Sequence, residues 1–225
     1  MMPGAIDKQR ISVYNDYIDD SGQKGGSPLP KCYSELEKAY IKQRLKEEAE
    51  KCLAQYGIRR TTVDELVKRV KIPKGTFYLF YRSKELLLFE VILDLHERIE
   101  QELLASLSVL DPHSLTVDHL TEVLFGCFKA MDDVPVLKLL NSDDMELLAR
   151  KLPPEVIADH LKQDDTMVEK LFTIFPMKAK QNAEAFSAAL RVLFLSSLQK
   201  EEIGDKQFDE ALKLLIRGLV LQMLS

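Results

Sequence analysis

The chain contains few residues that break helices, and long stretches between them are uninterrupted. Its 225 residues include nine glycines and nine prolines, and the segments between them are rich in Leu, Glu and Lys, which favour helices. Apolar residues in these segments recur every three or four positions, which is the period of an amphipathic helix. No segment shows convincing strand alternation. The sequence therefore predicts an all-α protein of about nine helices.

Capping residues and helix breakers set the expected helix ends. Thr62 and Glu65 have the spacing of a capping box, Ser83 precedes a long amphipathic segment, and Gly57 suits the position just after a helix. The same reasoning places Pro73 at the first position of a new short helix. The helices are expected over roughly 34–56, 61–70, 73–81, 84–107, 116–131, 135–151, 154–175, 183–203 and 206–224.

Residues 1–30 lack a helical or strand period and end in a Gly/Ser/Pro-rich run, so they are expected to form a flexible tail.

The sequence also disfavours disulfide-rich, membrane-spanning and secreted proteins. The three cysteines, Cys32, Cys52 and Cys127, are odd in number and have no C-x-x-C spacing, which argues against a disulfide framework and suits a reducing cytoplasm. No apolar run reaches the length of a membrane span, and the N-terminus lacks the apolar core of a signal peptide.

The charge is divided unevenly along the chain. The formal net charge is −5, which taken whole argues against nucleic-acid binding. Residues 31–85, however, hold 14 Lys/Arg against 8 Asp/Glu, a net of +6, whereas residues 86–225 hold 14 against 24, a net of −10. A basic module on an acidic body is the electrostatic pattern expected for a protein that directs one region toward phosphate.

Two short predicted helices lie inside this basic region. The segments 61–70 and 73–81 are separated by about three residues, which is the arrangement of a helix-turn-helix. Lys74 can reach a phosphate or a guanine edge, Thr76 offers a hydroxyl and a methyl group, and Tyr78 presents a phenol at phosphate reach. Gly75 costs about 1 kcal/mol relative to alanine inside a helix, a cost that close approach of another backbone would offset.

The run from Thr61 to Leu86, TTVDELVKRVKIPKGTFYLFYRSKEL, strongly resembles the DNA-binding signature of the tetracycline-repressor (TetR-type) family. The specific resemblance covers about residues 36–87, and the remainder is similar only in being helical and of suitable length. Lys71 replaces the usual turn glycine, and Phe77 and Tyr81 fall at packing positions. Residue chemistry and resemblance together assign DNA contacts to Thr61, Thr62, Lys71, Lys74, Gly75, Thr76, Tyr78, Leu79, Arg82 and Lys84.

The resemblance implies a transcriptional regulator, usually a repressor, that binds a pseudo-palindromic operator as a homodimer. It implies a DNA-binding domain over residues 31–85 and a ligand-binding and dimerisation domain over residues 86–225. The ligand would be a small apolar or amphipathic molecule that shifts the conformational population and weakens operator binding. Candidate pocket residues are Phe125, Phe128, Met131, Met145, Met167, Phe172, Phe186 and Phe194.

The last predicted helix is apolar on more than one side. A helix of this kind is buried on both sides, so one side can pack on the body and the other on a second copy of the chain. A central core helix in a monomer would show the same pattern, and the resemblance favours the dimer. The candidate dimer contacts are Leu214, Val220, Leu221 and Leu224.

An enzyme is disfavoured because the chain lacks a Gly-rich phosphate loop and a nucleophile elbow. The four histidines, at positions 96, 113, 119 and 160, have no recognised metal-binding spacing, so neither a metal nor a cofactor is expected. Paired acids such as Asp143-Asp144 and Asp164-Asp165 are expected on solvated surface or near helix starts. The remaining alternative to a regulator is an all-α protein-interaction adaptor whose basic patch contacts an acidic partner.

Overall fold

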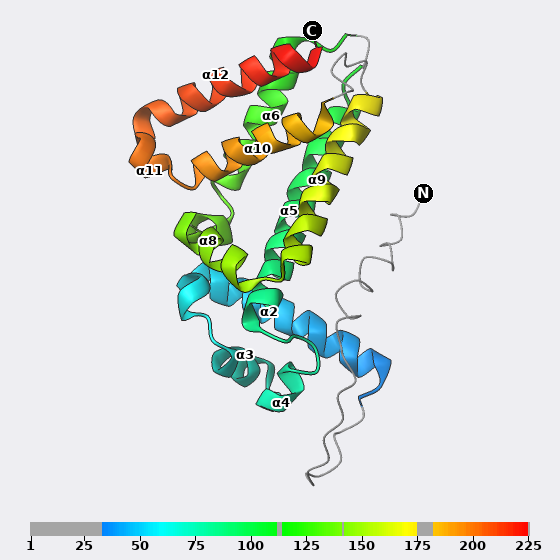
Figure 1. Cartoon of the computed structure of the whole chain (residues 1–225), viewed down its shortest axis with the longest axis vertical. Coiled ribbons are helices and arrows are strands. Elements are labelled where there is room, and N and C mark those ends of the chain that lie inside the picture. The colour runs from blue at the N-terminus through cyan, green and yellow to red at the C-terminus, as the bar shows by residue number, and fades with distance from the viewer. Residues whose placement is uncertain (1–32, 112–113, 141, 175–181, 225) are drawn as a thin grey trace. The chain divides into compact units, whose positions relative to one another are not determined.

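The computed structural model describes residues 33–111, 114–140, 142–174 and 182–224, and the predicted tail, residues 1–30, lies outside them. These described residues form eleven helices and no strand (Figure 1), which confirms the all-α prediction. The helices are α2 (Glu35–Arg60), α3 (Val63–Val70), α4 (Lys74–Phe77), α5 (Lys84–Ser108), α6 (Val117–Met131), α7 (Pro135–Leu139), α8 (Ser142–Lys151), α9 (Pro154–Ile174), α10 (Ala183–Ser197), α11 (Lys200–Ile203) and α12 (Asp205–Leu224).

Eleven helices are found instead of about nine because two predicted helices are interrupted. The segment 135–151 divides into α7 and α8 at Leu140, whose backbone is extended (φ −78°, ψ 135°) while its side chain is buried. The segment 183–203 divides into α10 and α11 after two serines. The hydroxyls of Ser196 and Ser197 donate to main-chain carbonyls three residues earlier, and such local bonds compete with the regular helix ladder.

Thr62 and Ser83 begin their helices as predicted, whereas Pro73, predicted at the first position of a helix, directly precedes α4, and Gly57, predicted after a helix end, lies inside α2. Thr62 Oγ1 accepts a hydrogen bond from the Glu65 amide at 3.2 Å, and Ser83 Oγ accepts one from the Leu86 amide at 3.3 Å. Gly57 adopts a left-handed φ of 69° and kinks α2 before its last three residues. A positive φ is strained for residues with a side chain, so glycine permits this change of direction. The third helix is shorter than expected, because α4 ends at Phe77 rather than near residue 81.

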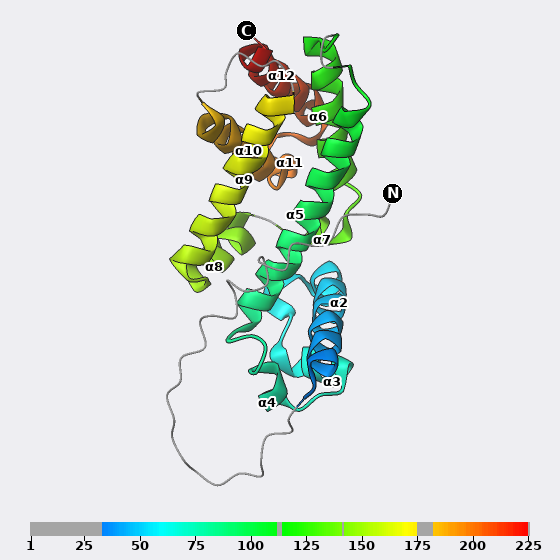
Figure 2. The ribbon, with the colours of Figure 1, turned by 90° about the vertical axis from the view of Figure 1, so that its right-hand side faces the viewer.

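Five of the remaining helices, α5, α6, α9, α10 and α12, enclose an apolar core. The helix α6 packs against α5 and α12, and α10 packs against α9 and α12. Figures 1 and 2 both show α9 running beside α5. The core is formed by side chains from all five helices, among them Leu107, Leu124, Phe172, Leu193 and Ile216. Within the described segments, no helix combines the length and apolar character needed to cross a membrane.

One helix connects the two predicted domains. The predicted boundary after residue 85 falls in the first turn of α5, so this helix runs without interruption from the helix-turn-helix into the body. The described residues from Leu36 onward belong to one compact unit. The first residue of α5 therefore contacts α2, and its C-terminal half contributes to the core of the body.

Candidate nucleic-acid interface

The helices α3 and α4 are joined by the tight turn that a helix-turn-helix requires. Lys71 ends α3 with a left-handed backbone (φ 61°, ψ 46°). The amide of Lys71 donates to the carbonyl of Lys68 at 3.3 Å, and the amide of Ile72 donates to that of Val67 at 3.0 Å. These bonds satisfy carbonyl groups at the helix end. Lys71 therefore occupies the conformation for which glycine would be the easier choice, as its position in the motif suggested.

Two aromatic side chains form the base on which α4 rests. Phe77 is fully buried and Tyr81 is 5% exposed, with ring centroids 5.9 Å apart. The ring of Tyr78 meets Phe77 edge-on at 5.3 Å but remains 51% exposed. The packing positions predicted for Phe77 and Tyr81 are confirmed. Because Phe77 anchors the helix from below, Tyr78 is held on the outer surface.

Most of the predicted DNA-contacting residues lie on the surface around α4. Lys74 is exposed at the start of this helix and pairs with the exposed Asp64 at 2.9 Å. Leu79 is 55% exposed although its side chain is apolar. The exposed residues of the predicted set are Thr62, Lys71, Lys74, Gly75, Tyr78, Leu79 and Arg82.

Three residues of the predicted set do not lie on this surface. Thr61 is fully buried and Thr76 is 7% exposed. Lys84 is partly buried, and its ammonium donates to the carbonyl of Thr61 at 2.7 Å and to that of Ile58 at 2.9 Å. The Thr61 hydroxyl in turn donates to the Gly57 carbonyl at 2.8 Å. Thr61 and Lys84 therefore join the end of α2 to the start of α5.

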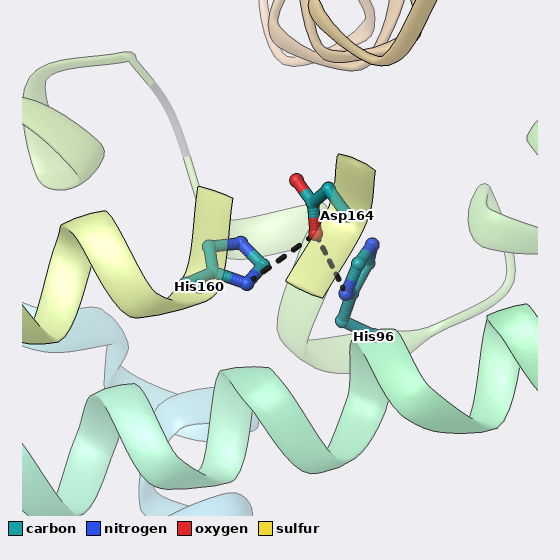
Figure 3. A group of neighbouring side chains, drawn as sticks. All are labelled: His96, His160 and Asp164. Carbon is teal, nitrogen blue, oxygen red and sulfur yellow. Dashed lines mark ion pairs between the residues drawn. The ribbon is translucent and has the colours of Figure 1, made fainter. Parts of the chain in front are cut away.

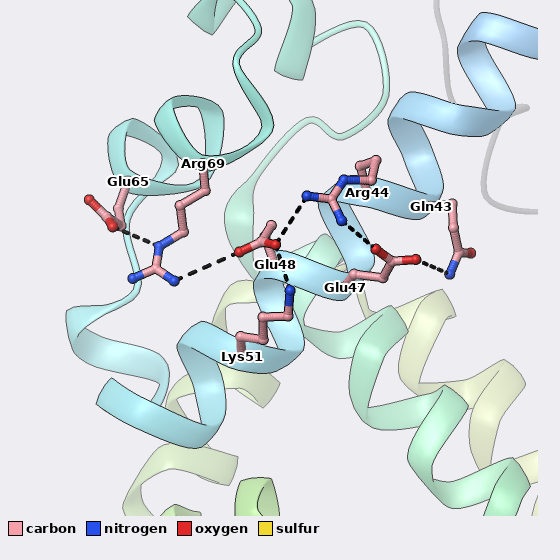
Figure 4. A network of polar contacts seen from close by, with 7 residues as sticks. All are labelled: Gln43, Arg44, Glu47, Glu48, Lys51, Glu65 and Arg69. Carbon is pink, nitrogen blue, oxygen red and sulfur yellow. Dashed lines mark hydrogen bonds and ion pairs between the residues drawn. The ribbon is translucent and has the colours of Figure 1, made fainter.

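A charged network that the sequence did not reveal connects α2 to α3 (Figure 4). Glu48 is 7% exposed, and its carboxylate faces Lys51 at 2.8 Å, Arg44 at 3.3 Å and Arg69 at 3.7 Å. Arg69 also pairs with Glu65 at 2.7 Å. The hydrogen bond from Lys51, with the charges of Arg44 and Arg69, lowers the pKa of Glu48 despite its desolvation. The network orients the helix-turn-helix against α2.

The candidate ligand-pocket residues are divided between different places. Phe172 and Phe186 are buried and meet edge-on, with ring centroids 5.5 Å apart. Phe125, Phe128 and Met167 are partly buried against the same core. Met131, Met145 and Phe194 are partly exposed and lie on α6, α8 and α10. A separate surface groove between α2 and α7 contains none of these eight residues; it is lined by Glu47, Glu50, Lys51, Ala54, Pro135 and Val136.

The candidate dimer residues on α12 face in different directions. Val220 is fully buried in the core of its own chain, and Leu224 is partly buried against that core. Leu214 is 71% exposed and Leu221 is 46% exposed. The exposed apolar residues that sequence reasoning omitted are Leu215 on α12 and, on α10, Val192 and Leu195. Helical spacing could have identified Val192 and Leu195, which lie three residues apart on α10, whereas Leu215 is the direct neighbour of the candidate Leu214.

The expectation that paired acids lie on solvated surface or near helix starts agrees with Asp144, which lies in the first turn of α8, and is wrong for Asp164, which is buried in the middle of α9. Asp144 is 6% exposed and Asp164 is 7% exposed. Asp144 lies 3.5 Å from Arg59 of α2, and Asp164 lies 3.2 Å from Arg191 of α10. Each buried carboxylate is near an arginine from a distant part of the chain, so the partner was invisible in the local sequence.

Known proteins match this chain most specifically in the helix-turn-helix region. Residues 45–91 match the family described as bacterial regulatory proteins, tetR family. The uncharacterized HTH-type transcriptional regulator YhgD of Bacillus subtilis (strain 168) is 30% identical over a segment covering 34% of this chain and 49% of that protein. The match thus spans about half the length of this relative.

Solved structures match the fold over most of the chain. The TetR family repressor AlkX from Dietzia sp., implicated in n-alkane biodegradation, gives a TM-score of 0.59 at 13% identity and covers 89% of this chain and 100% of its own. SmeT, solved as a complex with triclosan, gives a TM-score of 0.53 at 15% identity and covers 83% of this chain and 92% of its own. At these identities the likeness concerns the fold alone.

The matched segment contains the turn at Lys71, the α4 surface and the buried Phe77 and Tyr81. Proteins with this domain are transcriptional regulators and not enzymes. Residues 45–91 therefore match the helix-turn-helix region of the bacterial regulatory proteins of the tetR family, and the described chain has the same fold as the solved repressor AlkX.

Proposed function

We propose that this chain is a ligand-responsive repressor that binds a pseudo-palindromic operator as a homodimer. The observation that carries the proposal is the surface around α4, where Lys74, Tyr78 and Arg82 are exposed above the buried Phe77. A short helix of this kind can enter the major groove, while cationic and hydroxyl groups at its border contact phosphates.

Gly75 supports DNA as the partner of this surface. A Cβ atom added to Gly75 would meet nothing within 4 Å inside the chain, so packing within the protein does not require glycine there. Its φ is not positive, so the backbone does not require it either. The remaining physical reason for glycine in a helix is close approach from outside, and a DNA backbone in contact with α4 would make such an approach.

The apolar faces of α10 and α12 support a dimer. Leu214, Leu215 and Leu221 are exposed on α12, and Val192 and Leu195 are exposed on α10. The two helices pack against each other within the chain, so their exposed apolar residues lie on neighbouring elements. Two copies joined through these faces would bury them about a two-fold axis. Their helix-turn-helix units would then match two operator half-sites about 34 Å apart.

Regulation would use the continuous helix α5. Its C-terminal half contributes Leu103 and Leu107 to the core that also contains Phe172, and the ammonium group of its first residue, Lys84, donates to the carbonyl of Ile58 in α2. A small apolar or amphipathic ligand bound within the body would favour one position of α5 and thereby change the placement of the DNA-binding helices. SmeT, which shares this fold, was solved with triclosan, and an aromatic ligand of that kind suits the Phe172–Phe186 region.

The proposal is tested by fluorescence anisotropy with duplex DNA from upstream of the protein's own coding region, at two salt concentrations. Binding should weaken as salt rises, because phosphate contacts release counterions. The Lys74→Met variant should lower the salt dependence by about one unit of slope. Tyr78→Phe should weaken binding about three- to tenfold on all sequences, the loss expected for one hydrogen bond.

The control variant is Lys213→Met, which removes a lysine of α12 that pairs with Glu122. It should bind DNA as the unmodified chain does. If the chain binds no upstream DNA, or binds without salt dependence, the repressor proposal is wrong. Binding of an acidic protein by the same surface would then favour the alternative, an all-α protein-interaction adaptor.

A further inference from the structure

Two histidines and a buried aspartate converge from α5 and α9 (Figure 3). His96 lies on α5, and His160 and Asp164 lie one turn apart on α9. One nitrogen or oxygen atom from each of the three residues lies within 4.8 Å of the others. The imidazole rings meet edge-on with centroids 5.2 Å apart, and Phe89 packs against His160 at 5.9 Å.

One oxygen of the Asp164 carboxylate accepts no well-formed hydrogen bond from the described residues. The residue is 7% exposed, and this buried oxygen is Oδ1. This atom lies 3.5 Å from Nδ1 of His160 and 3.9 Å from Nδ1 of His96. Buried polar atoms are almost always satisfied, and an exception requires an explanation such as a bound ion.

The other carboxylate oxygen is held by a polar chain from α10. Arg191 Nη1 donates to Asp164 Oδ2 at 3.2 Å and to Ser187 Oγ at 2.6 Å, and it lies 3.5 Å from Asp165 Oδ1. This arrangement fixes the carboxylate plane and directs Oδ1 toward the two imidazoles. Metal-binding carboxylates are commonly oriented by hydrogen bonds of this kind.

We propose that His96, His160 and Asp164 bind a divalent transition-metal ion of the zinc type. Two imidazoles and one carboxylate are a common three-ligand set for such ions, with water as the fourth ligand. Bonds of about 2.0–2.2 Å at tetrahedral angles place ligand atoms about 3.3–3.5 Å apart. The pair Asp164–His160 already has this spacing, and the pair Asp164–His96 requires a side-chain movement of a few tenths of an ångström.

The charges around the site are compatible with a cation. Glu100 Oε1 lies 3.8 Å from Nδ1 of His96, and Asp165 lies beside Arg191. The three carboxylates, Asp164, Glu100 and Asp165, therefore outnumber the one guanidinium facing the cluster.

A metal ion here would join α5 to α9 directly. His96 is one ligand on the helix that begins at Lys84, and the other two ligands lie on α9. Binding would restrict movement of α5 along α9. The proposal of a metal site depends only on the geometry of these three residues. An effect of the metal on DNA binding depends also on the proposed function.

The test is a titration of the full chain, without a histidine tag and after treatment with a chelator, using ZnCl2 and CoCl2. Calorimetry should show saturable binding of one ion per chain, and bound Co2+ should show visible absorption typical of nitrogen and oxygen ligands. His160→Gln and Asp164→Asn should each weaken binding at least tenfold. His119→Gln, an exposed histidine on α6, and Cys127→Ser should bind as the unmodified chain does.

His96→Gln keeps the test valid if either α9 variant fails to fold. The His96 side chain is 39% exposed, so this replacement should fold normally, as circular dichroism would show, and still lose metal affinity. The proposal is overturned if binding is absent, or if folded His96→Gln retains full affinity. Loss of binding in His119→Gln or Cys127→Ser would also contradict it, because the ion would lie elsewhere.

A DNA-binding measurement with and without zinc separates the two proposals. If zinc binds but leaves the affinity for upstream DNA unchanged, the proposed metal site is supported and its proposed effect on DNA binding is wrong. If the chain binds no DNA at all, the repressor proposal fails, and the metal titration still decides the site.

Discussion

The ammonium group of Lys84 donates a 2.7 Å hydrogen bond to the carbonyl oxygen of Thr61, 23 positions earlier in the chain. This bond and its companion to Ile58 satisfy carbonyl groups near the end of α2. Lys84→Met removes both donors, and we expect it to lower the free energy of unfolding by about 1.5 kcal/mol, the lower end for bonds to charged groups. Chemical denaturation monitored by circular dichroism measures this change.

Lys74→Met is the matched control for that prediction. Lys74 is exposed and pairs with the exposed Asp64, and such surface ion pairs contribute little to stability because solvent screens them. We therefore expect little loss of stability and a clear loss of DNA affinity. If Lys74→Met lowered the free energy of unfolding more than Lys84→Met, the Lys84 bonds would not hold α2 to α5.

Gly75→Ala should separate folding from DNA binding. A Cβ atom meets no neighbour at this position, and alanine is a better helix former than glycine by about 0.5–1 kcal/mol. The variant should therefore be as stable as the unmodified chain or slightly more stable, yet bind upstream DNA at least tenfold more weakly. Equal DNA affinity would mean that no backbone approaches α4 closely in the complex.

Glu48→Gln should lower stability near neutral pH and have little effect in acid. The folded-state pKa of Glu48 is lowered, chiefly by the hydrogen bond from Lys51. Its contribution is therefore present above the unfolded-state pKa of about 4.3, and it is lost as the pH falls through the lower folded-state value. We expect a loss of about 1 kcal/mol near neutral pH.

Thermal unfolding at about pH 7 and about pH 3 measures this difference. Glu169→Gln is the control, because Glu169 is an exposed acid on α9. A Glu48→Gln variant whose deficit is the same at both pH values would show that the charge of Glu48 does not stabilise the network.

Leu214→Glu should convert a dimer into a monomer. Leu214 is 71% exposed on α12, next to the exposed Leu215, and a buried carboxylate in a two-fold contact would be repeated and left unpaired. Light scattering after size-exclusion chromatography gives the mass directly. Val109→Glu, at an 82% exposed position after α5, should leave the mass unchanged. A monomeric unmodified chain would rule out the proposed interface.

Local patterns in the sequence are sufficient for most elements of this fold. The capping residues Thr62 and Ser83 begin α3 and α5 as expected, because each bonds an amide only three residues away. The burial of Phe77 agrees with the packing position that the resemblance of residues 61–86 implies. The interruptions at Leu140 and after Ser197 were not predicted, because apolar periodicity continues through both positions.

The placement of charged side chains depended on the tertiary structure. Lys84 has the residue type and position of a phosphate contact, yet its ammonium reaches carbonyl groups 23 and 26 positions away. The burial of Glu48 and Asp164 likewise depends on arginines contributed by other helices. The spacing of residues in the sequence identifies neighbours along one helix. It does not show which charged side chain of another helix will contact them.

The sequence by itself determined the all-helical class and the helix-turn-helix, because short-range capping and helical periodicity govern both. The exposure of the predicted DNA contacts was decided by the tertiary structure, which buries Thr61 and Thr76 and directs Lys84 to main-chain carbonyls. Only the tertiary structure showed that Lys84 and Thr61 join α2 to α5, and that His96 meets His160 and Asp164 across two helices. Those groupings arise from the packing of α5 against distant segments, where the free energy of burial and long-range hydrogen bonding, rather than local propensity, brings the side chains together.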